Sequence, residues 1–419
     1  MIQHLLKLIW TQRRQNAWIV AELFIVFILL WYIMDFFITF GYTASIDSAY
    51  DIKDTYQVQL ATIPESSPLY VRYEEGEQQA AADFLSILER IRQHPQVESV
   101  CVSNMSAPYC ASYRDIRLSK DTIQTNDCHF LEVTPSYFEV FRIHPLAGGE
   151  PSQLAKALNE NSVIISRKFA QDEFPGEQAK GKPLYLKDDG EEFLIGDVCG
   201  PLKRDDYRPE EYAAYLLLSN SDLAQMDEGV LSQFEISIRV KPGLNQRDFI
   251  QNFQQDIREQ LSVGNFLLYK VRSFDDLRYT LYLSDGRMDE IRYRVAFMVF
   301  LVFNIFLGII GTFWFRNEYR KPEIGLRLAV GSTRSQILRM MIGEGWLLLS
   351  LVAIPAVILC INLAKMEFIG TNIMHITFFR IFFGLLLTYL FMAFIIMLGT
   401  WYPAYLSSRV APADTLRSE

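Results

Sequence analysis

The sequence predicts a protein of two parts: an α-helical membrane domain of four transmembrane helices and an α+β extracytoplasmic domain. Four stretches of roughly 20 mostly apolar residues are long enough to cross about 30 Å of hydrocarbon as helices. About 250 residues separate the first stretch from the second, which is the size of a folded domain. Strand-like and helix-like patterns alternate within that segment, as in an α+β domain.

The four apolar stretches contain no Lys or Arg and lie at residues 17–40, 295–315, 345–364 and 381–402. The first is too long for the apolar region of a signal peptide, and no small-x-small cleavage site follows it, so we expect an uncleaved anchor. It holds two acidic residues near its ends, Glu22 and Asp35. Either their side chains extend toward the membrane surface, or they pair with another subunit.

Charge predicts the orientation of the chain. Basic residues gather in the short segments 1–16, 316–344 and 403–419, which the positive-inside rule places in the cytoplasm. Residues 43–292 carry 41 acidic and 26 basic residues, a net charge of −15 against −9 for the whole chain. The sequence therefore predicts cytoplasmic termini, an acidic domain outside the membrane, and a short outer loop at 365–380.

The outer segment has the pattern of two β-α-β units that flank an insert. The expected elements of the two units are strand 56–62, helix 77–94 and strand 97–104, then strand 234–243, helix 246–261 and strand 267–274. Each helix places its apolar residues on one face. The insert, at about residues 108–230, looks strand-rich with short helices, so we expect two subdomains.

Cysteine placement fits this topology. Cys101, Cys110, Cys128 and Cys199 fall in the outer segment, and Cys360 falls in the third span. An oxidising compartment permits disulfides, and Cys101 and Cys110 are close enough in sequence for a local bridge. The pairing cannot be read from sequence, and four buried free thiols are the alternative.

The stretch GEQAKGKP at residues 176–183 comes close to a phosphate-binding loop. It spells G-x-x-x-x-G-K, but Pro183 stands where a Ser or Thr hydroxyl would bind Mg²⁺. A phosphate loop follows a buried strand and begins a helix, whereas here a helical pattern precedes and a strand pattern follows. We therefore interpret the segment as a turn in which Lys180 and Lys182 are solvated, and expect no ATP binding by this chain.

No other pattern predicts catalysis or a bound cofactor. The five histidines show no metal-ligand spacing, and the adjacent Cys128 and His129 would point to opposite faces of a strand. No G-x-S-x-G motif is present, and paired acids such as Glu191 and Glu192 are most simply surface residues. The chain is expected to be neither an enzyme nor a metal-binding protein.

The segment between the second and third spans predicts two short helices. Pro322 suits a first helical position, and Gly331 is placed to end that helix. Thr333 and Gln336 match a capping box for a second helix, which runs into the third span. The pair could lie among lipid head groups, or dock in a groove of a cytoplasmic partner and carry its motion across the membrane.

The motif EIGLRLAVGSTRSQIL, residues 323–338, resembles the signature of the FtsX/MacB-type permeases of ABC transporters, the type VII or mechanotransmission class. The matching positions are Glu323, Ile324, Gly325, Arg327, Ala329, Gly331 and Ile337. The chain end resembles that of the family through Pro403, Ala404, Pro412, Leu416 and Arg417. Parts of the outer segment look like stretches of MacB-like periplasmic domains, at residues 133–149, 161–174, 181–186 and 193–200. GEQAKGKP falls on a structural turn of that family.

Three features depart from the family pattern. Val330 and Ser332 differ from the commonest residues beside the motif glycine. The first span is usually more uniformly apolar than one that holds Glu22 and Asp35. The MacB transporter carries a fused ATPase domain, and these 419 residues contain none.

The resemblance implies a permease subunit in a bacterial inner membrane that converts ATP hydrolysis by a separate ATPase into movement of its periplasmic domain. The expected partners are separate ATPase subunits, a second permease copy or homologue, and the lipid bilayer; ATP and Mg²⁺ would be used by the ATPase subunits. Whether a periplasmic adaptor and an outer-membrane channel also take part is left undecided by the sequence. No nucleic acid is expected. The expected ATPase-coupling residues are Glu323, Ile324, Gly325, Leu326, Arg327, Leu328, Val330 and Gly331. Glu323 and Arg327 would make polar contacts, while Leu326, Leu328 and Val330 would fill the groove.

The predicted function is export or extraction of a periplasmic or outer-leaflet substrate. The alternative is an FtsX-like regulator that activates an extracytoplasmic enzyme such as a cell-wall hydrolase. The size of the outer domain favours the transporter, because such regulators tend to have smaller ones. Two other classes of protein are less favoured. Sensors that pair with histidine kinases usually have more than the four spans predicted here, and a stand-alone membrane enzyme would need a catalytic cluster, which the sequence does not indicate.

Overall fold

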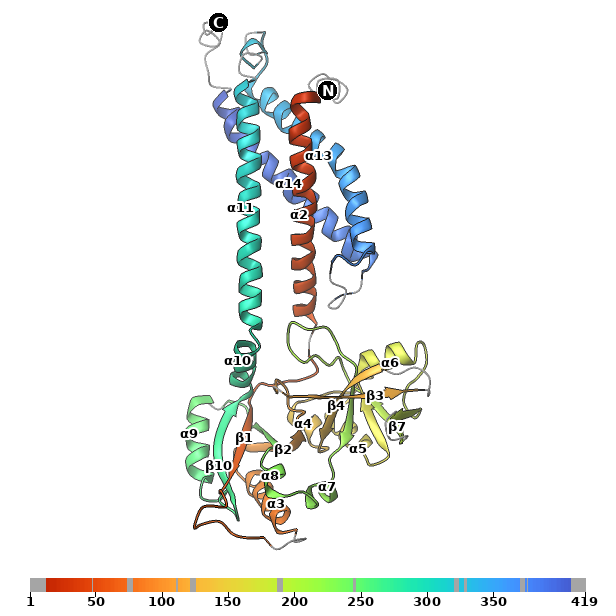
Figure 1. Cartoon of the computed structure of the whole chain (residues 1–419), viewed down its shortest axis with the longest axis vertical. Coiled ribbons are helices and arrows are strands. Elements are labelled where there is room, and N and C mark those ends of the chain that lie inside the picture. Colours follow the sequence, from red (N-terminus) through yellow and green to blue (C-terminus); the bar gives the residue numbers. More distant parts are fainter. Residues whose placement is uncertain are drawn as a thin grey trace. The chain divides into compact units, whose positions relative to one another are not determined.

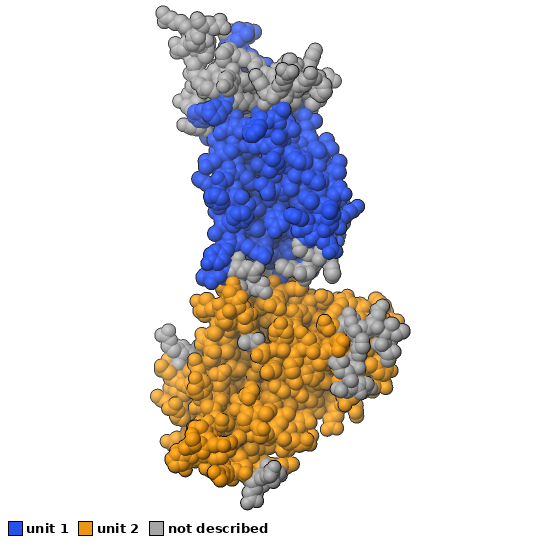
Figure 2. Space-filling view, viewed as in Figure 1, with its two compact units in different colours: residues 1–45, 289–419 blue, residues 46–288 orange. Residues whose placement is uncertain are grey.

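The computed structural model describes residues 13–407 apart from 47, 74–77, 111, 121–125, 187–190, 244–245, 320–323, 328–329, 370–373 and 375. The chain divides into two compact units (Figures 1 and 2). The membrane domain consists of residues 1–45 and 289–419, and the outer domain of residues 46–288.

The membrane domain is built from four long helices: α2 (Arg13–Ser45), α11 (Arg287–Tyr319), α13 (Arg334–Lys365) and α14 (Phe378–Ser407). Each contains a stretch long and apolar enough to cross a membrane, in agreement with the predicted fold class. Side chains of α2, α13 and α14 share one apolar core, which includes Phe27, Leu348 and Met392. Helix α13 runs without a break from the segment before the third span into the span itself, as the capping box predicted.

Part of the outer domain is an antiparallel sheet in the order β10-β1-β9-β2. Its strands are β1 (Thr55–Thr62), β2 (Val97–Asn104), β9 (Glu235–Val240) and β10 (Phe266–Ser273). Helices α3 (Gln79–Arg92) and α9 (Gln246–Ile257) join them in two β-α-β units, as predicted. Because β9 lies between β1 and β2, the units interleave, which is the ferredoxin-like arrangement. Phe84 and Ile87 of α3 and Phe253 and Ile257 of α9 bury their side chains in its core.

The insert between β2 and β9 forms a closed ring of strands. Within the described residues the ring order is β4-β3-β6-β7-β5-β8, and a parallel pairing of β4 with β8 closes it. The strands are β3 (Arg114–Ser119), β4 (Asn126–Val133), β5 (Ser162–Ile165), β6 (Pro183–Leu186), β7 (Glu192–Val198) and β8 (Ala213–Leu217). The predicted strand-rich insert is therefore confirmed. A short pairing of β2 with β4 links the ring to the sheet.

In the part of the outer domain that the structure describes, six shorter helices complete the fold: α4 (Tyr137–Val140), α5 (Pro151–Ala157), α6 (Arg167–Glu173), α7 (Asn220–Ala224), α8 (Glu228–Leu231) and α10 (Phe274–Ser284).

A buried arginine joins the sheet to the insert. Arg239 on β9 is 1% exposed and donates hydrogen bonds to the carbonyls of Val140 (2.5 Å), Lys53 (2.8 Å) and Asp51 (2.5 Å). Burial lowers the pKa of this guanidinium, and the three acceptors compensate for its lost hydration.

The proposed bridge between Cys101 and Cys110 is absent from the structure, where all five cysteines are free thiols. Cys101 is a buried residue of strand β2, and Cys110 Sγ donates to the carbonyl of Ser112 at 2.9 Å. Burial raises the pKa of both thiols, which keeps them protonated and slows oxidation. The alternative of free thiols describes this structure, since Cys101, Cys128 and Cys199 are buried and Cys110 is partly so.

Candidate coupling site

A short helix precedes α13, and a glycine ends it. Residues 324–327 are helical. The N–H of Val330 then donates to the carbonyl of Leu326, and that of Ser332 to the carbonyl of Arg327, each at 3.0 Å. Gly331 has φ +99°, a conformation that side chains with a Cβ rarely adopt. The predicted helix stop at Gly331 is confirmed.

The capping box at the start of α13 is also confirmed. The Thr333 hydroxyl accepts from the N–H of Gln336 at 3.3 Å, and Gln336 Oε1 accepts from the N–H of Thr333 at 2.9 Å. Ile324 is 2% exposed and packs with Ile337 and Met341 of α13. The turn is therefore fastened to α13 in two ways. The hydrogen bonds of the capping box hold the start of the helix, and the apolar side chain of Ile324 packs against its first turns.

The expected coupling residues divide into two groups. Ile324 and Gly325 are buried and support the turn. Leu326 and Val330 are 57% and 81% exposed, so a partner could cover them. Arg327 is partly buried and its Nη1 contacts the sulfur of Met340. Glu323 and Leu328 lie outside the described residues.

Asp35, one of the two acidic residues of the first helix, pairs within the chain. Its carboxylate accepts two hydrogen bonds from Arg380 of α14, from Nε at 2.8 Å and from Nη2 at 2.7 Å. Both side chains are buried, with 8% and 1% of their surface exposed. Arg380 Nη1 also donates to the carbonyl of Met374. The interpretations of Asp35 as a residue directed to the membrane surface, or paired with another subunit, are both wrong for this structure.

Glu22 also has a partner in the same chain, because the hydroxyl of Thr312 on α11 donates to it at 2.8 Å. Glu22 is partly exposed, and the two interpretations of its role stay predictions.

The sequence contained a usable signal for Asp35, since Arg380 directly precedes the fourth apolar stretch. An acidic residue in a span needs a partner, and this arginine lies at the matching end of another span.

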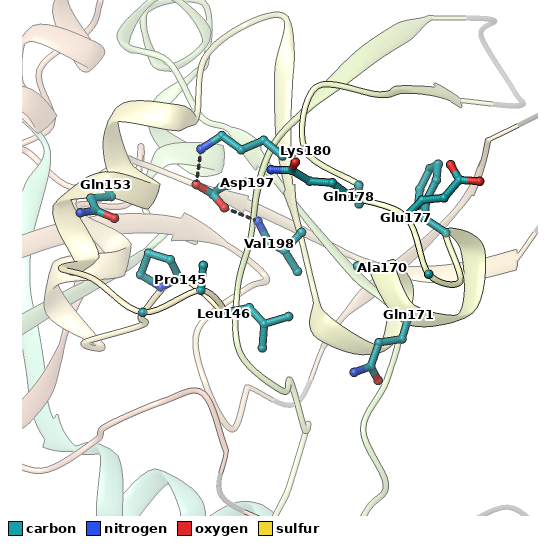
Figure 3. Close-up of a pocket in the computed structure, with 15 residues that line it drawn as sticks. Pro145, Leu146, Gln153, Ala170, Gln171, Glu177, Gln178, Lys180, Asp197 and Val198 are labelled. Carbon is teal, nitrogen blue, oxygen red and sulfur yellow. Dashed lines mark hydrogen bonds and ion pairs between the residues drawn. The ribbon is translucent and has the colours of Figure 1, made fainter.

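The GEQAKGKP segment is a turn between α6 and β6, as interpreted from the sequence. Gly176 and Gly181 have φ of +74° and +81°. Lys180 pairs with Asp197 at 2.7 Å, and Lys182 forms an ion pair with Glu177, so both amines are paired as well as solvated. Lys180 and Asp197 line a pocket of about 590 Å³ that also holds Gln153, Gln171 and Gln178 (Figure 3). The loop is followed by β6, so it lacks the helix N-terminus that a phosphate loop provides.

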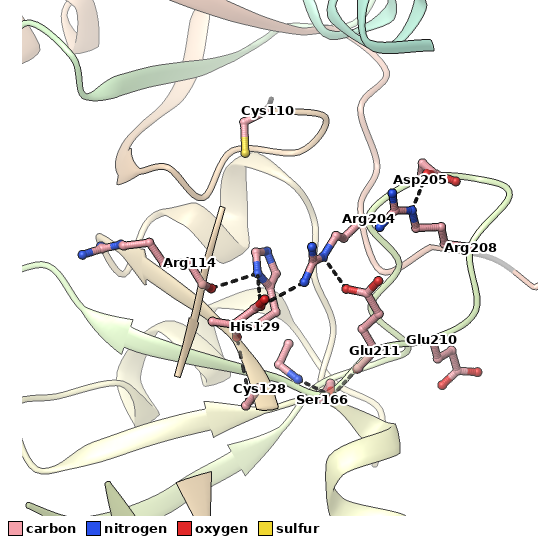
Figure 4. Close-up of polar contacts among 12 residues, drawn as sticks. Cys110, Arg114, Cys128, His129, Ser166, Arg204, Asp205, Arg208, Glu210 and Glu211 are labelled. Atoms are coloured by element: carbon pink, nitrogen blue, oxygen red, sulfur yellow. Dashed lines mark hydrogen bonds and ion pairs between the residues drawn. The ribbon is translucent and has the colours of Figure 1, made fainter. Parts of the chain in front are cut away.

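Cys128 and His129 point to different surroundings, as predicted (Figure 4). Cys128 lies in the apolar core of the ring. His129 is buried with its Nδ1 3.3 Å from the carbonyl of Arg114. The neighbouring Arg204 pairs with Asp115 at 2.9 Å and with Glu211 at 2.5 Å. Among the described residues, no three His, Cys, Asp or Glu side chains are placed to hold a metal.

This cluster makes the stability of the outer domain depend on pH. Burial, with a further contribution from Arg204, lowers the pKa of His129 to about 4, whereas Asp115 raises it. Between about pH 6.5 and about pH 4 the unfolded state therefore binds a proton that the folded state does not. The contribution of His129 to the stability of the folded domain is therefore complete above about pH 6.5 and is lost as the pH falls toward about 4.

We expect acidification from about pH 6.5 to about pH 5 to cost about 2 kcal/mol through His129. The variant His129→Gln should be less sensitive to pH over this range, while His144→Gln, at an exposed site, should behave like the unchanged protein. Denaturant unfolding of the full chain in detergent at the two pH values measures the difference. Equal pH sensitivity of His129→Gln and the unchanged protein would contradict this assignment.

Residues 295–412 match the family described as FtsX-like permease C-terminal. The matched range contains α13, α14, most of α11 and the coupling segment. A search among curated proteins finds no matching sequence. The resemblance drawn from residues 323–338 is thus confirmed, since that motif lies within the region that is similar to FtsX-like permease C-terminal domains.

Solved structures of three domains are similar to part of this chain. The periplasmic region of MacB from Actinobacillus actinomycetemcomitans has 10% identity and a TM-score of 0.34, over 56% of this chain and 94% of that one. A domain of a putative permease from Porphyromonas gingivalis has 13% identity and a TM-score of 0.34, over 55% and 98%. The extracellular domain of the noncanonic ABC-type transporter YknZ from Gram-positive bacteria has 11% identity and a TM-score of 0.29, over 51% and 100%.

Proposed function

We propose that this chain is the permease subunit of an ATP-driven complex and that it moves its outer domain to export or extract a periplasmic or outer-leaflet substrate. The observation that carries the proposal is the FtsX-like match over a segment whose exposed residues, Leu326 and Val330, stand on a turn fastened to α13. A partner that binds this turn could shift α13, because Ile324 packs against that helix and the capping box links the two.

The proposal assigns ATP and Mg²⁺ to separate ATPase subunits on the cytoplasmic side and no catalytic role to this chain. Both termini lie in the cytoplasm and the outer domain in the periplasm, with the bacterial inner membrane between them. The acidic outer segment and the basic short segments support this orientation. A second permease copy or homologue completes the complex, and an adaptor and an outer-membrane channel would extend it.

Affinity purification of the chain from its native membrane in mild detergent tests the proposal. A stoichiometric soluble protein with Walker motifs is the expected result. A co-purifying adaptor would support the transporter, while a co-purifying hydrolase would favour the regulator of an extracytoplasmic enzyme. Absence of any ATPase in several detergents would overturn the assignment of the coupling site.

Charge placed on the exposed part of the turn should prevent ATPase binding. We expect Leu326→Asp with Val330→Asp, and separately Arg327→Glu, to reduce co-purified ATPase at least about tenfold, which corresponds to about 1.4 kcal/mol. Membrane insertion should be unchanged, because the core contacts of Ile324 are kept. The matched control is Met366→Asp. Met366 is 77% exposed and lies just beyond the opposite end of α13. Undiminished ATPase recovery with both variants would contradict the proposed interface.

A further inference from the structure

Helix α10 joins the outer domain to the membrane helix α11 through a two-residue junction. The N–H groups of Asp285 and Gly286 donate to the carbonyls of Leu281 and Leu283, and Gly286 has φ +62°. These contacts end α10, and α11 begins at the next residue, Arg287. Any displacement of α11 along its axis therefore reaches the outer domain first at α10.

The end of α10 nearest this junction is held by polar contacts. The Tyr282 hydroxyl donates to Asp206 Oδ2 at 2.8 Å and accepts from the N–H of Asp206 at 3.2 Å. Arg278, one turn earlier, lies 3.8 Å from the same carboxylate. The opposite end of α10 is held by apolar contact, since the buried Phe274 ring packs edge-on against Phe141.

Asp206 also binds a second tyrosine, from the loop at residues 105–110. The Tyr109 hydroxyl donates to Asp206 Oδ1 at 3.2 Å, and its ring lies edge-on to that of Tyr282. Asp206 stands between β7 and β8, in the insert. Tyr109, Asp206 and Tyr282, here called the tyrosine clamp, thus connect three segments that are distant in sequence.

The 105–110 loop is held in a strained conformation. Met105 and Tyr109 have φ of +49° and +59°, in the left-handed region that residues other than glycine rarely adopt. Glu235 of β9 holds the middle of the loop by accepting from the N–H groups of Ser106 at 2.9 Å and Ala107 at 2.8 Å. Such strain persists only while the surrounding contacts impose it.

Open space lies next to the strained loop. A pocket of about 400 Å³ is lined by the loop on one side and by Leu277, Leu281 and Ser284 of α10 on another. Close-packed interiors switch between discrete arrangements and do not deform continuously. The pocket gives the loop somewhere to move once Tyr109 is released.

We propose that the tyrosine clamp passes the movement of α11 into the outer domain. When α11 draws α10 away, the hydrogen bonds of Tyr282 to Asp206 break, Tyr109 loses its neighbour, and the 105–110 loop relaxes toward the pocket. This inference rests on the proposed function, which supplies the movement of α11. Tyr282 and Asp206 act here as positioning residues, since they make no contact with a substrate.

Hydrogen exchange measured by mass spectrometry tests the clamp. The sample is the full chain with its co-purified ATPase in lipid nanodiscs, with and without ATP, and the readout is exchange in peptides that cover residues 105–110. Tyr282→Phe removes only the hydroxyl and keeps the ring. Tyr279→Phe, on the same helix at a position 57% exposed, is the matched control.

We expect ATP to raise exchange in the loop of the unchanged protein and of Tyr279→Phe. In Tyr282→Phe, exchange should be raised already without ATP, and addition of ATP should cause no further change. A purely structural role would raise the basal exchange but leave the ATP-dependent difference intact, and that result would overturn the inference alone. If the unchanged protein with its ATPase shows no ATP-dependent change in the loop, the inference fails, whereas failure of the proposed function would show earlier, as the absence of a co-purifying ATPase.

Discussion

Replacing Asp35 with Ala is expected to destabilise the membrane domain by about 3–5 kcal/mol. The substitution removes the carboxylate that accepts two hydrogen bonds from the buried Arg380 guanidinium, whose Nη1 also donates to the carbonyl of Met374. Removing one member of a buried ion pair costs more than the intact pair contributes. Unfolding of the purified full chain in SDS, titrated from a mild detergent, measures the loss.

Two further variants make this prediction specific. The double substitution Asp35→Leu with Arg380→Met should recover most of the lost stability, because an apolar pair of similar volume avoids burying any charge. Arg292→Ala breaks an exposed ion pair with Asp289 in the same unit and should cost less than about 1 kcal/mol. If Asp35→Ala proves no less stable than Arg292→Ala, the buried pair does not form in the membrane-embedded protein.

The neighbouring contact explains why Arg380 and Asp35 meet. Trp31, one turn before Asp35, lies against Gly384, one turn after Arg380, where an added Cβ would come within 3.4 Å of the indole nitrogen. Helices α2 and α14 therefore run in opposite directions at close range, which brings the two charged residues to the same level. The absence of a side chain at Gly384 is part of what allows the ion pair.

Replacing Arg239 with Met should destabilise the outer domain by about 3 kcal/mol or more. Methionine fills much of the same volume but donates no hydrogen bond, so the carbonyls of Asp51, Lys53 and Val140 lose the charged donor that the buried Arg239 side chain supplies. Each unsatisfied buried polar group costs about 1–3 kcal/mol. The loss should appear as a lower denaturant midpoint, with the membrane domain unaffected because it is a separate unit.

The control for Arg239 is Arg92→Met on α3, where the arginine pairs with Glu89 at the surface and 61% of its side chain is exposed. This change should alter stability by less than about 0.5 kcal/mol. Arg239→Lys should lie between the two, because one ammonium group cannot serve three acceptors as the planar guanidinium does. A midpoint for Arg239→Met that equals that of Arg92→Met would show that the sheet and the insert are held together without this arginine.

Much of this architecture was predictable because it depends on short-range patterns. The four apolar stretches, the amphipathic faces of α3 and α9, the capping box at Thr333 and the stop at Gly331 each involve residues within a few turns of one another. The near match to a phosphate loop was rejected on the same grounds, since the elements before and after it were of the wrong kind. For the coupling segment, sequence named the exposed Leu326 and Val330 but did not separate them from the buried Ile324.

The sequence by itself determined the four membrane helices, the two β-α-β units, the strand-rich insert and the FtsX-like segment, because apolar length, helical period and local motifs are properties of contiguous residues. The tertiary structure alone decided that β9 lies between β1 and β2, that the insert closes into a ring, and that Cys101 and Cys110 stay apart. It also decided that Asp35 meets Arg380, 345 residues away, and that Tyr282 meets Asp206. These contacts join distant segments, and only the packing of whole helices and strands determines which distant side chains share a buried position.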